Sequence, residues 1–372
     1  MSTPEIKGYC PGALRPMMSG DGLVVRIRPL NGHLSHAQTQ GIAALSQCYG
    51  NGIIDISSRA NVQLRGVTPD SHAPLIEGLR ALSLIDSSEA TESRRNVLVT
   101  PFWQTGDETE ALATALTDAL GQPDAPAIPH KFGFAIDTGP KPVLQTASAD
   151  IRLERDENAG LILVADGMTT GKPVKAEESI DEAIALAHWF MRTRTDQTRM
   201  AKQFKDGTPP PAGFTTERQT QTYVPAPGPT PQGMLAGIAF GQIKAGAFST
   251  FGDIRLTPWR MILLEGIQNP PKLDGLITDP TDPLLRITAC TGAPECSQGL
   301  NQTRPIARIL APHLKPSQTL HISGCAKGCA HPKAAPLTLT ATQSGFDFIR
   351  NGRAADTPAQ TALTSTDIIK AL

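Results

Sequence analysis

The sequence predicts an α+β fold that contains an internal duplication. Two segments, "IDISSRANVQLRGV" and "IRLTPWRMILLEGI", share one apolar pattern when they are aligned on Gly66 and Gly266. The coinciding pairs are Leu64 with Leu264, Val62 with Ile262, and Ile56 with Leu256. A second apolar run precedes each segment, "GLVVRIRPL" in the first copy and "MLAGIAFGQI" in the second. Each copy should therefore form two strands, and the two copies should pair around a pseudo-twofold axis. Because strands and helices do not strictly alternate, α+β is favoured over a doubly wound sheet.

The first copy has a helical stretch between its two apolar runs, "HAQTQGIAALSQCYG" at residues 36–50. Ser35 precedes this stretch and is a residue type that caps helix N-termini. His33 and His36 have a spacing that can hold a metal on one helix turn, but with Ser35 as the cap we expect both imidazoles in solvent.

A longer helix is expected at residues 179–204, "SIDEAIALAHWFMRTRTDQTRMAKQF", where Ser179 and Asp181 suit a helix start. Proline is dense in the following residues 207–233. Proline lacks an N–H donor and fixes φ, so this stretch predicts an extended linker or surface loop between two halves of the chain.

Length and composition place the chain among globular proteins of two or three domains. It has 372 residues, of which 40% are apolar and 19% charged, and its net charge is −1. This charge gives no global attraction to nucleic acid or to an anionic membrane. The N-terminal residues do not have the pattern of a secretory signal, and no apolar run is long enough to span a membrane. We expect a cytoplasmic protein without nucleic-acid or membrane partners.

Four of the six cysteines stand in two close pairs near the C-terminus, within "ACTGAPECSQGL" and "HISGCAKGCAHP". Five residues separate Cys290 from Cys296, and three separate Cys325 from Cys329. Buried structural cysteines would not need such pairing, and zinc usually takes pairs spaced by two to four residues. A 4Fe–4S cluster tolerates wider gaps because its edges are longer than one ion. Residues 286–333 also carry six Lys or Arg and one acid, which suits an anionic cluster or ligand. The cluster is favoured; zinc and plain burial remain alternatives.

Cys10 and Cys48 stand alone and are expected to be small buried apolar residues. "ADGMTTGKPV" does not have the spacing of a phosphate-binding loop, and no G-x-G-x-x-G occurs. The chain is therefore not expected to carry its own nucleotide-binding domain.

The pattern C-T-G-x3-C followed by G-C-x3-C resembles the sirohaem and 4Fe–4S signature of the nitrite and sulfite reductase superfamily. Three further segments are similar to that superfamily. "DISSRANVQLRGV" and "SRRNVLVTP" resemble segments that carry active-site arginines, here Arg59 and Arg95. "IPHKFGFAID" resembles the segment whose alternate lysines face the macrocycle, and it retains Lys131. The resemblance implies paired ferredoxin-like half-domains joined to iron–sulfur and tetrapyrrole-binding α/β domains. It also implies that Arg59, Arg95 and Lys131 bind substrate carboxylates.

Two departures from the reductase pattern are informative. Gly133 replaces the second macrocycle-facing lysine, which should open space at the macrocycle face. The run Ala326-Lys327-Gly328 replaces a proline-asparagine-serine run. The opening "CPGALRPMMSGDGLVVRIRP" and the ending "GCAKGCAHP" resemble the precorrin-3B synthase family of aerobic cobalamin biosynthesis.

That resemblance implies a monooxygenase with a 4Fe–4S cluster, a mononuclear non-haem iron and no permanent sirohaem. Its substrates would be precorrin-3A and dioxygen, and its product a meso-hydroxylated ring A γ-lactone. NADH would be the ultimate reductant, through a separate reductase. A sirohaem-dependent nitrite or sulfite reductase is the alternative enzyme. A non-enzymatic iron–sulfur or zinc protein is the alternative outside catalysis, and it would not need cations converging from distant segments.

These expectations assign five regions and three weaker candidates. Arg15 and Arg65 are weaker anion-binding candidates, and His331 is a possible hydrogen-bond donor to cluster sulfur. The expected regions are a first ferredoxin-like half-domain (1–72), a first reductase-like domain (73–206), the linker (207–233), a second half-domain (234–275) and a 4Fe–4S domain (276–372).

Overall fold

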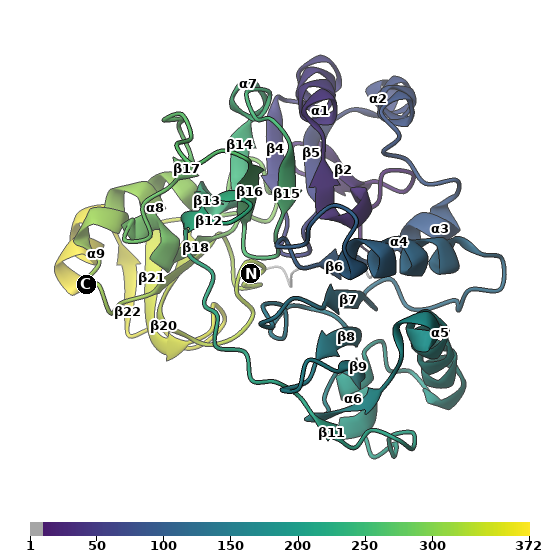
Figure 1. Ribbon diagram of the computed structural model, residues 1–372. Coiled ribbons are helices and arrows are strands. Elements are labelled where there is room, and N and C mark those ends of the chain that lie inside the picture. Colours follow the sequence, from purple (N-terminus) through teal and green to yellow (C-terminus); the bar gives the residue numbers. More distant parts are fainter. Residues whose placement is uncertain (1–9) are drawn as a thin grey trace.

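The computed structural model describes residues 10–372; residues 1–9, which the expectations for the leader and the first half-domain include, lie outside the described residues. Four β-sheets form the framework (Figure 1). The first half-domain is a five-stranded antiparallel sheet with helices α1 and α2 packed on one face. Its strands, in sheet order, are β1 (Met17–Ser19), β2 (Gly22–Ile27), β5 (Val62–Val67), β4 (Ile53–Ile56) and β14 (Gln242–Lys244); its helices are α1 (His36–Tyr49) and α2 (Pro69–Ala81).

The second half-domain repeats this sheet and confirms the predicted duplication. Its strands, in sheet order, are β12 (Gly228–Thr230), β13 (Gly233–Ile238), β16 (Met261–Glu265), β15 (Ile254–Leu256) and β3 (His33–Leu34); β17 (Leu276–Ile277) pairs with β13, and α7 (Ala245–Phe248) is its short helix. The hairpin registers match: Ile54 pairs with Leu64 in one copy, and Ile254 with Leu264 in the other. The copies exchange strands, because β3 completes the second sheet and β14 the first.

A middle domain is built on a six-stranded mixed sheet. Its strands, in sheet order, are β11 (Thr216–Glu217), β10 (Thr170–Pro173), β9 (Leu161–Ala165), β8 (Ile151–Arg155), β7 (Phe134–Asp137) and β6 (Val97–Val99). Its helices are α3 (Glu89–Arg94), α4 (Glu108–Gly121), α5 (Ala176–Thr193) and α6 (Met200–Lys205). The continuous apolar sequences of β7 and β9 are buried on both faces, as parallel and central strands require. Phe132, Phe134 and Phe190 form the centre of this core.

The C-terminal domain has the same sheet topology as the middle domain. Its strands, in sheet order, are β18 (Ile287–Ala289), β19 (Leu320–Ser323), β20 (Ala335–Thr342), β21 (Gly345–Gly352) and β22 (Gln360–Leu363), with helices α8 (Arg304–Leu310) and α9 (Ser365–Ala371). In both domains the first three strands are parallel, and the next two are antiparallel to their neighbours. The duplication therefore includes these domains, although their sequences share no apolar pattern that predicted it.

Three local expectations differ from the structure. The single helix expected at residues 179–204 is two helices, because α5 ends at Thr193 and α6 begins at Met200. Helix α5 begins at Ala176 rather than at Ser179, whose hydroxyl donates to the Ala176 carbonyl inside the first turn. Helix α2 continues across the expected domain boundary at residue 72. The Pro-rich segment is extended, but it also supplies two sheet strands, β11 and β12, because its glycine and threonine residues retain N–H donors.

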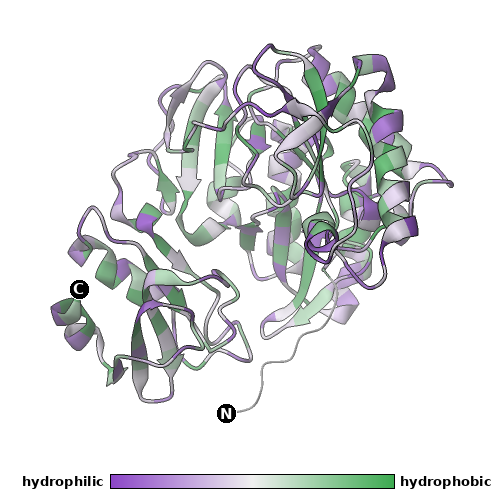
Figure 2. Ribbon diagram, turned by 90° about the horizontal axis from the view of Figure 1, so that it is seen from below, coloured by the Kyte–Doolittle hydropathy of each residue, from purple (hydrophilic) through white to green (hydrophobic). Residues whose placement is uncertain are grey.

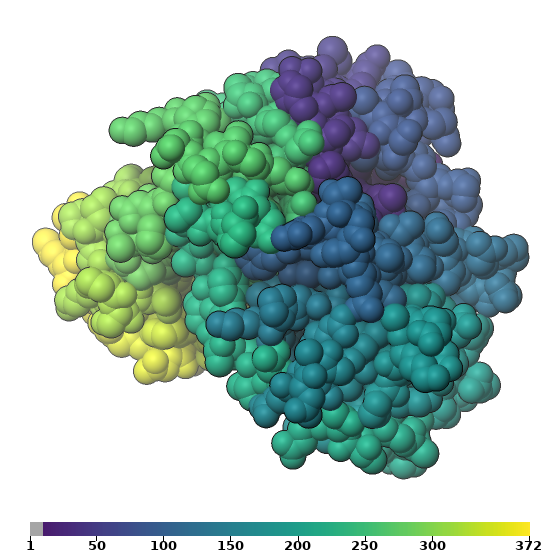
Figure 3. All heavy atoms as spheres, in the orientation of Figure 1, coloured from purple at the N-terminus to yellow at the C-terminus, as the bar shows by residue number. Residues whose placement is uncertain are grey.

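The domains surround a common centre, with apolar residues concentrated on strands and inward helix faces and hydrophilic residues on the outer loops (Figure 2). The Pro-rich segment is visible on the surface between the middle and C-terminal domains (Figures 1 and 3). Among residues 10–372, no helix is long and apolar enough to cross a membrane.

Candidate functional site

The two cysteine pairs lie on loops that follow neighbouring parallel strands. Cys290 comes directly after β18, and Cys325 follows β19 after one glycine. β18 and β19 are parallel, so their carboxyl ends, and the loops that carry the thiols, meet at the same sheet edge. Tertiary structure thus brings together two pairs that are far apart in the sequence.

Glycines allow these loops to approach closely. The Gly324 N–H donates to the Cys290 Sγ at 3.1 Å. A Cβ on Gly324 would lie 3.0 Å from the Gly292 Cα and 3.4 Å from the Cys290 Sγ. Gly292 has φ 69°, and its own Cβ would lie 2.7 Å from the Thr303 Oγ1. Residues with side chains would therefore push the two loops apart.

The four thiols are close enough to influence one another. Cys329 is exposed at the rim, yet desolvation by neighbouring protein atoms raises its pKa; Lys327 opposes this shift, and Cys325, Cys290 and Cys296 add to it. Among the described residues, no group of three or more His, Cys, Asp or Glu is arranged to hold a single metal ion. A 4Fe–4S cluster would hold its four thiolates further apart than a zinc ion, whose sulfurs would lie about 3.8 Å apart.

Two arginines stand beside this thiol site. Burial lowers the pKa of both Arg260 and Arg304, and Cys290 and Asp55 act in the opposite direction on each. The Nε of Arg304 is buried without a hydrogen-bond partner among the described residues. Fixed positive charge at this position would stabilise an anionic thiolate-bound group.

The Cys296 loop packs on the β1–β2 turn of the first half-domain. The Ser19 hydroxyl donates to the Glu295 carbonyl at 3.4 Å, and a Cβ on Gly20 would lie 2.6 Å from the Ser297 nitrogen. Nearby, Arg65 is held by Asp21 at 2.6 Å. Arg65 therefore has a structural partner and is not an available anion-binding group.

A polar row crosses the face of the first sheet that lies opposite helices α1 and α2. Gln242, Asp55, Gln63 and Arg26 stand side by side on β14, β4, β5 and β2. Gln242 donates to Asp55 at 3.1 Å, and Arg26 donates to Gln63 at 2.9 Å. Because Asp55 also faces Arg304, the row connects the thiol site with the arginines at the opposite edge of the sheet.

Those arginines form a cluster of Arg26, Arg28 and Arg59, which we call the arginine cluster. The pKa of Arg26 is lowered to about 10, first by burial and then by the charge of Arg28; Cys10 opposes this shift, and Arg59 adds to it. Burial likewise lowers the pKa of Arg28 and Arg59. Among residues 10–372, Arg28 has Glu92 at 3.5 Å, whereas the hydrogen-bond acceptors of Arg26 and Arg59 are not carboxylates, although the charge of Asp150 raises the pKa of Arg59. The cluster therefore carries excess positive charge.

The predicted residues Arg59 and Lys131 meet in this cluster. The Arg59 Nη2 donates to the Lys131 carbonyl at 2.8 Å and to the Ser148 hydroxyl at 3.3 Å. The Lys131 side chain is exposed at the edge. Asn96 connects the same segment to the cluster, because its Oδ1 accepts from Arg28 and its Nδ2 donates to the carbonyls of residues 130 and 132.

Arg95, which was expected to bind substrate carboxylates, already has a carboxylate partner within the protein. Its guanidinium makes a bidentate ion pair with Asp86, at 2.7 and 2.8 Å, in a largely buried position. The charge of Arg95 lowers the pKa of Arg28, so Arg95 lies beside the arginine cluster. Its Nε and Nη2 donors, however, are already bound to Asp86. Arg15, the other weaker candidate, forms an exposed ion pair with Glu89 at 3.4 Å.

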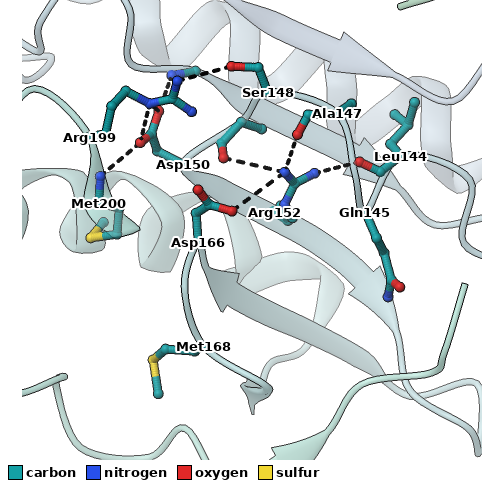
Figure 4. Close-up of polar contacts among 12 residues, drawn as sticks. Leu144, Gln145, Ala147, Ser148, Asp150, Arg152, Asp166, Met168, Arg199 and Met200 are labelled. Carbon is teal, nitrogen blue, oxygen red and sulfur yellow. Dashed lines mark hydrogen bonds and ion pairs between the residues drawn. The ribbon is translucent and has the colours of Figure 1, made fainter. Parts of the chain in front are cut away.

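Buried Asp150, which Figure 4 shows between Arg199 and Met200, also anchors the segment that carries Lys131. Its carboxylate accepts from Arg199, from the Met200 N–H and from the Gly133 N–H. Gly133 does not open space at the macrocycle face as expected, because its Cβ would lie 3.1 Å from the Asn96 carbonyl oxygen. Gly133, which stands in place of the second macrocycle-facing lysine, therefore lies at a position where the backbone is tightly packed.

The histidine candidates have other partners. Ser35 caps α1, as expected, but His33 faces Glu265 at 3.3 Å and His36 Nδ1 lies 2.8 Å from the Phe251 carbonyl oxygen, so neither ring is simply solvated. The His331 ring packs edge-on against buried His321.

The lone cysteines also differ from the expectation of burial. Cys48 is exposed, and Cys10 is half-buried beside Arg26. Sequence reasoning missed Arg26 and Arg28, although the alternation in "VVRIRP" was a usable signal. Two arginines spaced by one apolar residue on a strand must face the side opposite its apolar residues.

Comparisons with known proteins agree with this architecture. Residues 15–82 match the nitrite/sulfite reductase ferredoxin-like half domain. The chain is 29% identical to a precorrin-3B synthase from a Sinorhizobium species, over 95% of this chain and 84% of that protein. It is 22% identical to a chloroplastic ferredoxin–nitrite reductase from Zea mays, over 84% of this chain and 68% of that protein. The NirA protein of Mycobacterium tuberculosis superposes with a TM-score of 0.61 at 18% identity, covering 94% of this chain and 79% of that one. The predicted resemblance is thereby confirmed: the chain has the nitrite and sulfite reductase fold, and over most of its length its sequence is more similar to that precorrin-3B synthase than to the maize nitrite reductase.

Proposed function

We propose that the protein is a precorrin-3B synthase, an oxidoreductase that hydroxylates precorrin-3A with dioxygen and forms the ring A acetate γ-lactone. The similarity to a precorrin-3B synthase along 95% of the chain supports this assignment. The observation that carries it in the structure is the polar row, which connects four converging thiols with the arginine cluster on one sheet face. A bound macrocycle on that face would reach both ends of the row.

In this proposal Cys290, Cys296, Cys325 and Cys329 hold a 4Fe–4S cluster. The close loop approach at Gly324 and the N–H donated to the Cys290 sulfur suit thiolate ligands. Such a cluster supplies one-electron transfer when bound. The electrons would come from NADH through a separate reductase in the cytoplasm.

The mononuclear non-haem iron that the sequence resemblance implies does not fit the side chains described here. No group of three or more His, Cys, Asp or Glu among residues 10–372 is arranged to hold one metal ion. We therefore assign it no ligands and derive no step from it.

The arginine cluster would bind the carboxylates of precorrin-3A. A uroporphyrinoid carries eight carboxylates, and planar guanidinium groups can bind them through two parallel hydrogen bonds. Arg26 and Arg59 suit this role because neither guanidinium donates to a carboxylate of the described residues. Lys131, exposed at the edge, would contribute a further positive charge, whereas Arg95 would orient the cluster through its pair with Asp86.

The decisive experiment separates an oxygenase from a reductase. Purified protein with a chemical reductant is given precorrin-3A under heavy-isotope dioxygen, and the product is examined by mass spectrometry. A product heavier by one labelled oxygen atom is expected, together with the absence of bound sirohaem from the absorption spectrum. Stoichiometric sirohaem with turnover of nitrite or sulfite would refute the proposal and assign the chain to the reductases.

A further inference from the structure

The duplication of the middle and C-terminal domains places a cavity at the position that mirrors the thiol site. β6 and β7 correspond to β18 and β19, and the loops that follow them lie at the same sheet edge. Thr100 follows β6 as Cys290 follows β18. When β7 and β19 are aligned at their first paired residues, Gly139 and Val143 fall at the positions of Cys325 and Cys329.

All three of these counterparts line one cavity of about 560 Å³. Its other walls are aromatic or proline-rich. The rings of Phe102 and Tyr223 meet edge-on at 5.7 Å, and Tyr223 continues to Trp259 at 5.9 Å. Trp259 occupies, in the second half-domain, the hairpin position that Arg59 has in the first. The positions of Cys290, Cys325 and Cys329 are thus occupied here by threonine, glycine and valine, and the position of Arg59 by Trp259, which contacts the lining residue Tyr223.

Hydrogen bonds hold the cavity open. The Pro-rich segment forms one wall, and Gln145 and Gln221 fix it to the middle domain by exchanging backbone-to-side-chain hydrogen bonds of 2.8 and 3.0 Å. Gln232 donates to the Phe102 carbonyl at 2.9 Å. Asp137, which is buried, accepts from the backbone N–H of Val143 at 2.8 Å. A cavity with walls fixed in this way is preformed, as small-molecule sites usually are.

The charge of the cavity defines the ligand class. Among its lining residues Lys141 is the only charged side chain, and it is exposed at the edge. One cation cannot compensate the eight carboxylates of a uroporphyrinoid, so a second tetrapyrrole of that kind is excluded by charge. Aromatic and proline side chains favour a flat apolar ring system. We propose that this cavity binds a planar aromatic molecule with a single negative charge, which Lys141 holds.

The test uses anilinonaphthalene sulfonate, a planar aromatic monoanion whose fluorescence rises in apolar sites. Full-length protein should bind it saturably at one site. Ala226→Trp, a change at an exposed wall residue, should fill the cavity and abolish this saturable binding. Lys141→Glu should weaken binding about fivefold or more. Lys272→Glu, with the same charge change on an exposed lysine that does not line the cavity, should match the unchanged protein.

Two outcomes would overturn the proposal. One is an equal change of the probe's dissociation constant in Lys141→Glu and in Lys272→Glu, because the charge at the cavity would then have no specific role. The other is saturable binding that survives in Ala226→Trp with an unchanged urea-unfolding midpoint. Arg59→Ala distinguishes this cavity from the proposed substrate site: probe binding should persist in that variant, and its loss would place the probe at the arginine cluster instead.

Discussion

Replacing Arg26 by methionine tests the arginine cluster most directly. Methionine retains an unbranched side chain of similar reach and removes the guanidinium. The groups that lose a partner, Gln63 and Cys10, are neutral or weakly acidic, so no strong carboxylate is left unpaired. Folding should therefore be affected much less than binding of an anionic substrate.

The magnitude follows from the pKa of Arg26. A pKa of about 10 instead of 12.5 means that the folded protein holds this charge at a cost of about 3 kcal/mol, at 1.36 kcal/mol per pKa unit. A substrate carboxylate that pairs with Arg26 recovers part of this cost. Loss of the contact should weaken binding by about 1.5–3 kcal/mol, or roughly 10- to 150-fold. Since the methionine variant removes the burial cost too, its free energy of unfolding should fall by less than about 1 kcal/mol.

The assay is an anaerobic titration with precorrin-3A, which separates binding from turnover, alongside urea unfolding. Arg80→Met on exposed α2 is the matched control and should leave affinity unchanged. Unaltered precorrin-3A affinity in Arg26→Met would show that the arginine cluster does not bind the substrate, and the reasoning from its uncompensated charge would be wrong.

Three further predictions concern the cluster ligands, the buried ion pair and a buried carboxyl. Cys296→Ser should remove most bound iron and sulfide in elemental analysis, whereas Cys48→Ser should retain them; full iron content in the first variant would contradict the four-ligand assignment. Arg95→Met should lower the free energy of unfolding by about 2–4 kcal/mol, because it leaves a largely buried carboxylate unpaired; a loss of substrate affinity alone would show instead that Arg95 binds substrate directly. Burial raises the pKa of Asp137 to about 7, so the folded state favours its protonated form; stability is gained at low pH and lost as pH rises through 7. Urea unfolding should therefore show a loss of about 2–3 kcal/mol between about pH 5 and 8, and Asp137→Asn should remove this dependence; the same dependence in Asp137→Asn would assign it to another group.

The sequence by itself determined the duplicated half-domains and the grouping of the thiols. The hairpin pattern around Gly66 and Gly266 could be read locally, because strand alternation is set by residues two apart and both copies keep it. The cysteine pairs could be read for a similar reason, since each pair lies within one loop.

Tertiary structure alone decided which cations remain available. Arg95 and Arg59 both lie in segments that resemble arginine segments of the same superfamily, but Arg95 is paired with Asp86, whereas Arg59 donates to neutral groups among residues 10–372. Arg26 gains its importance from burial by the surrounding fold and from the charges of Arg28 and Arg59, the latter in the turn between β4 and β5. Electrostatic pairing depends on distances across the fold, and these distances cannot be inferred from the separation of residues along the chain.

The second duplication was also hidden in the sequence, because the middle and C-terminal domains share strand order rather than an apolar pattern at one offset. Loops of different length and chemistry follow equivalent strands in the two domains, so Thr100 and Cys290 share a position without sharing a motif. A sheet preserves its topology through backbone hydrogen bonds, which tolerate almost any side chain, whereas a site depends on the side chains that the loops carry. The local sequence therefore determined the strands, and the packing of the domains decided where the thiols, the arginine cluster and the aromatic cavity lie.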